Sequence, residues 1–98
     1  MLLHIRHEHT EQRCPALDQE LMNSTFKIVL SEEHRKKCNL ELISAYIDGP
    51  GHTIFLIVDA DDMANVVRFL LPLNKIGKGE VRPVIDVRDL TKLTGMKG

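Results

Sequence analysis

The feature that most constrains this fold is a run of five apolar residues, Ile54 to Val58, with turn residues before it and aspartates after it. The run is short and rich in β-branched residues, so residues 53–59 are predicted to form a strand. Side chains of a strand alternate between its two faces, and here both faces are apolar. This pattern indicates an interior strand that is buried on both sides.

Three further segments have strand character. Residues 2–9 alternate, with Leu3, Ile5, His7 and His9 on one face. Residues 40–48 form the next candidate, which the turn Gly49-Pro50-Gly51 joins to the central strand. Its expected first face is Leu40, Leu42, Ser44, Tyr46 and Asp48. Residues 80–87 form the last candidate after an expected turn at residues 77–79, and Pro83 assigns it to a sheet edge because proline cannot donate to a ladder.

Two segments carry apolar residues at helical spacing. The first follows the capping residue Asp18, and Ser31 either caps a further helix or interrupts this one. Its stripe contains Leu17, Leu21, Met22, Phe26, Val29 and Leu30. The second helix follows an aspartate-rich segment and is expected to end or kink at Pro72. Its stripe contains Met63, Val66, Val67, Leu70 and Leu71.

The resulting order βαββαβ predicts an α+β, ferredoxin-like fold, with both helices on one face of a four-stranded antiparallel sheet. Right-handed crossovers give the spatial strand order 4-1-3-2. A chain of 98 residues is too short for two cores, so residues 1–88 are expected to form a single domain and residues 89–98 a loose tail. Phe55 and Ile57 would remain on the face without helices, which predicts a homodimer that pairs its sheets.

Charge and composition exclude several functions. Thirteen basic residues against fourteen acidic ones give a net charge of -1, which argues against nucleic-acid binding and a polybasic membrane anchor. The longest apolar runs are far too short to span a membrane, and the start of the chain lacks a signal-peptide pattern. We therefore expect a cytoplasmic protein, with Cys14 and Cys38 as thiols rather than a disulfide.

The predicted topology brings His7, His9, Cys14 and His52 to one end of the sheet. The first and third strands are antiparallel neighbours, so the end of one lies beside the start of the other. Imidazole and thiolate groups are the usual ligands of zinc and other divalent transition metals. We therefore predict a metal site there, whose reaction the sequence does not reveal. Two residues of the second strand are expected to support it, Tyr46 and Asp48.

Other interpretations of these residues remain open. A slip of one residue would turn His52 to the other face of the sheet, and a His-x-His pair also arises by chance. Without a metal, a histidine could act as a general acid or base in a pocket lined by Phe26 and Phe55 that binds a small molecule. The dimer could also be a small-ligand sensor that does not depend on the histidines.

Two stretches carry a resemblance to known proteins. They are Leu3-His4-Ile5-Arg6-His7-Glu8-His9-Thr10 followed by Cys14-Pro15, and Gly51-His52-Thr53-Ile54-Phe55. In them the chain resembles an uncharacterised microbial family of small ferredoxin-like proteins, over residues 1 to about 87. That family is similar to the dimeric α+β barrel superfamily, which includes cofactor-free monooxygenases, muconolactone isomerases, haem proteins and ligand sensors. The resemblance implies a dimer and a pocket between sheet and helices, and it assigns no catalytic residue.

Overall fold

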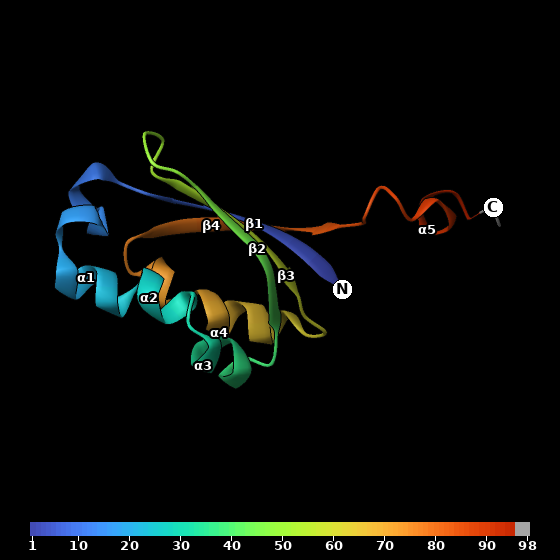
Figure 1. Ribbon diagram of the computed structural model, residues 1–98, viewed down its shortest axis with the longest axis horizontal. Helices are drawn as coiled ribbons and strands as arrows, with labels where there is room; N and C mark the ends of the chain where they lie inside the picture. Colours follow the sequence, from blue (N-terminus) through green and yellow to red (C-terminus); the bar gives the residue numbers. More distant parts are fainter. Residues whose placement is uncertain (96–98) are drawn as a thin grey trace.

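The computed structural model describes residues 1–95, which form a four-stranded antiparallel sheet in the order β2-β3-β1-β4 (Figure 1). The strands are β1 (Leu2–His9), β2 (Glu41–Asp48), β3 (Thr53–Asp59) and β4 (Gly77–Val84). This order is the predicted one, with the most apolar strand in the interior and the strand that contains Pro83 at an edge. The α+β class and the βαββαβ arrangement are confirmed.

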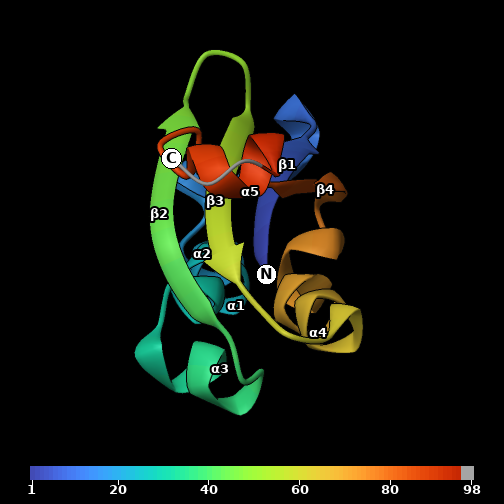
Figure 2. The same ribbon diagram turned by 90° about the vertical axis from the view of Figure 1, so that its right-hand side faces the viewer.

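Helices cover one face of this sheet. Two short 3-10 segments, η1 (Glu11–Arg13) and η2 (Pro15–Leu17), lead into α1 (Gln19–Ser24), α2 (Phe26–Val29) and α3 (Glu32–Lys37). The long helix α4 (Met63–Asn74) lies on the same side of the sheet (Figures 1 and 2). Between the two layers, the fully buried side chains include Ile5, Leu56, Val58, Val29, Val66 and Phe69. The other face of the sheet carries no helix among the described residues.

Capping residues mark where the helices begin. Asp18, Ser31 and Asp62 accept hydrogen bonds from the backbone amides of Leu21, His34 and Ala64, at 3.0, 3.2 and 2.8 Å. Asp18 and Ser31 were candidate caps in the sequence, and Asp62 belongs to the aspartate-rich segment expected before the second helix. Pro72 does not end its helix, because α4 continues to Asn74. Pro72 lies in the last turn of α4, where it removes one helical hydrogen bond, and the neighbouring Leu73 is buried.

The start of β4 differs from the prediction. Residues 77–79 were expected to form a turn, yet β4 begins at Gly77, opposite His9 of β1, and ends at Val84. A Cβ atom on Gly77 would lie 1.8 Å from the carbonyl oxygen of Glu8. The glycine therefore allows close approach of two strands, which sequence patterns do not distinguish from a turn.

An irregularity in β2 changes which of its side chains face the helices. The register shifts between Leu42, which pairs with Val58, and Ser44, which pairs with Ile57. The predicted uninterrupted alternation is therefore wrong, because a bulge inserts an extra residue into the strand. Beyond the bulge, Ile47 lies on the helix-covered face and Tyr46 on the open face.

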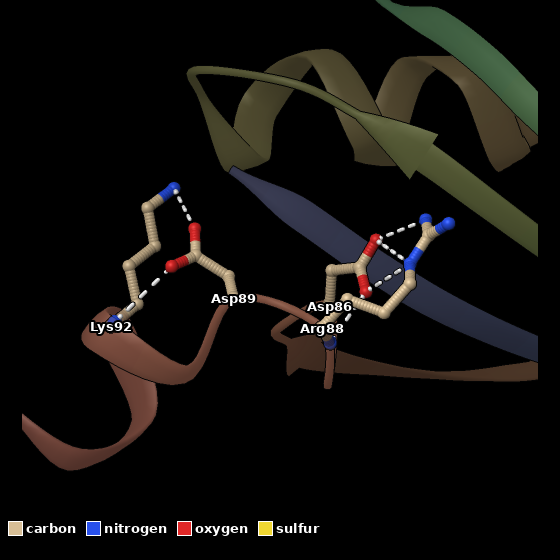
Figure 3. Close-up of polar contacts among 4 residues, drawn as sticks. All are labelled: Asp86, Arg88, Asp89 and Lys92. Carbon is tan, nitrogen blue, oxygen red and sulfur yellow. Dashed lines mark hydrogen bonds and ion pairs between the residues drawn. The ribbon is translucent and has the colours of Figure 1, made fainter. Parts of the chain in front are cut away.

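The chain leaves the sheet after β4 and ends in a projecting arm, which we define as residues 85–95 (Figures 1 and 2). The arm contains α5 (Leu90–Thr94), whose cap Asp89 accepts a hydrogen bond from the amide of Lys92 at 3.3 Å. Arg88 pairs with Asp86 and holds the pKa of that carboxyl far below its usual value (Figure 3). The tail expected at residues 89–98 thus has local structure, and its residues 96–98 lie outside the described part. No helix within residues 1–95 is both long and apolar enough to cross a membrane.

Candidate metal centre

Three of the predicted ligands meet at one end of the sheet. His9 ends β1, Cys14 lies between η1 and η2, and His52 immediately precedes β3. One ligand atom from each residue lies within 4.8 Å of the ligand atoms of the other two. These distances are short enough for a single ion to contact all three with small side-chain adjustments.

Antiparallel pairing of β1 with β3 places the two imidazoles together. The backbone amide of His9 donates to the carbonyl of His52 at 3.0 Å, which extends the ladder by one residue beyond β3. The side chains then meet, with 3.3 Å between His52 Nδ1 and His9 Nε2. Their ring planes are inclined at 77°, so one ring presents its edge to the other.

The turn before β3 holds His52 in an uncommon backbone conformation. His52 has a φ of 51°, in the left-handed region, where side-chain-bearing residues are unusual. Its amide donates to the carbonyl of Gly49 at 3.1 Å. On either side, Asp48 accepts from the amide of Gly51 at 3.1 Å and Thr53 donates to the carbonyl of Gly51 at 2.8 Å. These bonds fix the direction in which the imidazole leaves the backbone.

The loop after β1 brings the thiol to the imidazoles. The amide of Cys14 donates to the carbonyl of Glu11 at 3.3 Å, closing η1, and buried Pro15 begins η2. The guanidinium of Arg13 donates to the carbonyl of Lys75, which ties this loop to the end of α4. Cys14 is a free thiol and is partly exposed.

A pocket of about 140 Å³ adjoins the three ligands. The remaining residues that line it are Pro15, Ala16, Met22, Phe26, Ile47 and Gly49. Phe26 lies edge-on to the His9 ring, with 5.8 Å between ring centroids. Phe26 is thus one of the apolar residues that form the walls of this pocket around one polar cluster.

Burial favours the neutral form of His9. Removal from water lowers its pKa, and the nearby His52 lowers it further because two imidazolium charges would repel. The Nδ1 atom of His9 is buried and has no hydrogen-bond partner among residues 1–95. A neutral imidazole with an available nitrogen is the form that coordinates metal ions.

His7 lies apart from this cluster. It is fully buried on the same face of β1 as His9, and neither ring nitrogen has a hydrogen bond of normal geometry within the described residues. Burial lowers its pKa and His9 lowers it further, against smaller opposing effects from Asn74 and the backbone of Leu73. Its ligand atoms are not among those that meet, so its role in metal binding stays a prediction.

The other predicted pocket residues lie elsewhere. Tyr46 and Phe55 pair on the open face of the sheet, opposite to the face of His9, so the expectation that Phe55 lines the pocket is wrong. Asp48 also belongs to that face, and its carboxylate accepts a hydrogen bond from the amide of Gly51 in the turn before His52. Sequence reasoning missed Ile47, because the bulge reverses its face, and Met22, which appeared only as part of an apolar stripe.

Residues 9–97 match the family described as a domain of unknown function, DUF3303. The chain belongs to this family. All three clustered ligands fall inside the matched range, whereas His7 precedes it. A comparison with curated proteins finds no match.

Proposed function

We propose that this protein binds one transition-metal ion through His9, Cys14 and His52. The observation that carries the proposal is the convergence of three ligand atoms, all within 4.8 Å, from three separate segments of the chain. The donor set of two imidazoles and one thiolate suits zinc and related borderline metals. The available nitrogen of buried, neutral His9 supports it.

With these three protein ligands alone, a coordination position would remain for a small molecule, as in catalytic rather than structural metal sites. A metal bound there would polarise an oxygen of that molecule or activate a water. The apolar walls of the pocket would exclude bulk water and select a small, largely apolar compound. A cytoplasmic location is proposed with this function, because a reducing compartment keeps the Cys14 thiol available for the metal.

Metal titration of tag-free protein tests the proposal. We expect one zinc or cobalt ion per chain and a higher melting temperature with metal, because the ion binds the folded state. Cys14→Ser and His52→Ala should each weaken binding by on the order of a hundredfold or more, as expected when one ligand is lost. His4→Ala on the open face and Cys38→Ala in the core are matched controls that should keep the affinity. The absence of stoichiometric metal would refute the proposal.

A metal-free acid–base site is the alternative that the same geometry supports. The 3.3 Å contact between the rings of His9 and His52 could pass a proton to or from a compound in the pocket. Binding of a small molecule to metal-free protein, lost in His9→Gln and retained with a strong chelator, would favour it. Binding of the same molecule to untreated protein that a chelator abolishes would instead favour the metal.

We further propose a homodimer that pairs the open faces of two sheets, the arrangement that the resemblance to dimeric α+β barrels implies. Tyr46 is 70% exposed on this face, beside partly exposed Phe55 and Ile57. A monomer rarely leaves such a patch in water. The arm adds four exposed apolar side chains: Ile85, Val87, Leu90 and Leu93. A second copy of the chain would cover both surfaces.

A further inference from the structure

A fourth soft donor borders the candidate metal centre. Met22 of α1 lines the same pocket as His9, Cys14 and His52. Its thioether sulfur is polarisable and carries no charge, so it can sit in an apolar wall without the cost of burying an ionised group. Met22 also packs against the core, and its sulfur-containing side chain reaches the wall of the pocket.

The charge of the pocket wall distinguishes between metal ions. Apart from the three ligands, the lining residues are uncharged and include no carboxylate. With the Cys14 thiolate, a monovalent ion would form a neutral unit, whereas a divalent ion would leave a net positive charge in apolar surroundings. An uncompensated charge in such surroundings is costly. The Cys14 thiolate would therefore balance the charge of a monovalent ion fully and that of a divalent ion only in part.

From these two observations we propose, on the basis of the metal site proposed above, that the ion is Cu(I) and that the Met22 thioether is its fourth donor. Thiolate, thioether and imidazole together form a donor set suited to copper. Zinc sites in proteins use thiolate, imidazole and carboxylate ligands, and a thioether adds little for zinc. Met22 thus distinguishes copper from zinc in this site.

The experiment compares Cu(I) and zinc binding in wild-type, Met22→Leu and Met63→Leu proteins. Leucine keeps the volume and apolar character at position 22, and exposed Met63 at the start of α4 is the matched control. Oxygen-free competition with a chromogenic Cu(I) chelator should show on the order of tenfold weaker Cu(I) binding in Met22→Leu, and zinc affinity within about twofold of wild type. Met63→Leu should match wild type for both ions.

X-ray absorption at the copper edge provides a readout that a purely structural role of Met22 would not change. Wild-type protein should show two sulfur neighbours of copper, and Met22→Leu one. If Met22→Leu does not fold, wild-type protein in which selenomethionine replaces methionine provides the same test, because copper should then show a selenium neighbour.

One sulfur neighbour in wild-type protein, no selenium neighbour, or equal Cu(I) affinity in Met22→Leu would overturn the copper inference and leave the metal site intact. Failure of the wild-type protein to bind either Cu(I) or zinc would refute the metal site itself. The two failures are therefore distinguishable.

Discussion

The two cysteines show how the surroundings of a residue decide its chemistry. Cys14 is partly exposed beside two imidazoles, whereas Cys38 is 3% exposed after α3. Burial raises the pKa of the Cys38 thiol, against a smaller opposing effect from Arg68. Since the thiolate is the reactive form, the buried Cys38 thiol should react slowly, whereas Cys14 is accessible to reagents.

We therefore expect iodoacetamide to alkylate Cys14 in the native protein much faster than Cys38, by on the order of tenfold or more, because the buried thiol remains protonated. Peptide mass spectrometry over a time course measures both rates. Bound metal should protect Cys14 and leave the slow rate of Cys38 unchanged. Faster labelling of Cys38, or Cys14 labelling that metal does not slow, would contradict the assignment.

At this scale the sequence predicted most of the candidate site but not its boundary. The sequence predicted that His9, Cys14 and His52 lie close together, because strand pairing and loop length restrict their relative positions. Whether His7 joins them depends on side-chain positions that pairing does not set. Whether Met22 lines the pocket depends on how α1 is rotated against the sheet, and side-chain packing sets that rotation.

At the scale of elements, local signals predicted the helix starts and long-range contacts decided the strand limits. Asp18, Ser31 and Asp62 act within three residues of themselves, so their roles are visible in the sequence. The start of β4 depends on its distance from β1, and the bulge in β2 depends on pairing with β3. Neither contact leaves a pattern in the local sequence. For this reason the start of β4 and the bulge in β2 were not predicted.

Gly77→Ala tests the close approach of β4 to β1. The added methyl group would lie 1.8 Å from the carbonyl oxygen of Glu8, so the strands must separate next to His9. We expect a loss of about 1–3 kcal/mol in the free energy of unfolding, measured by urea denaturation, as for other overpacked sites. Gly49→Ala is the control: a methyl group there has no atom within 4 Å, and its effect should stay within about 0.5 kcal/mol. Equal effects of the two substitutions would contradict this account.

At the scale of the whole molecule, the chain is more extended than a single compact domain. Its Cα radius of gyration is 15.0 Å, compared with about 13 Å for a compact chain of this length. The longest dimension is 51 Å, and the projecting arm lies along it (Figure 1). Sequence analysis predicted the apolar open face but not the arm helix, because residues after β4 lack a long apolar pattern. In the proposed dimer, the exposed apolar side chains of this arm would pack on the other copy.

Replacing Leu90 and Leu93 together by aspartate should therefore weaken the proposed dimer while each chain keeps its fold. Both leucines are exposed on the arm, at 65% and 48%, so the substitutions cost little in a monomer. Burial of each leucine against a partner would contribute about 1.5–3 kcal/mol, so we expect the dimer Kd to rise by at least about a hundredfold. Sedimentation equilibrium measures this change, with unaltered circular dichroism as evidence of folding.

Val67→Asp is the matched control, because Val67 is 53% exposed on α4, on the side of the sheet away from the open face. It introduces one negative charge, where the arm variant introduces two, at similar exposure and should leave the dimer Kd unchanged. A monomeric wild-type protein at high concentration would refute the dimer. Equal weakening by Val67→Asp and by the arm variant would mean that added charge, rather than the arm, determines association. Only selective weakening by the arm variant fits a dimer in which each arm packs on the partner.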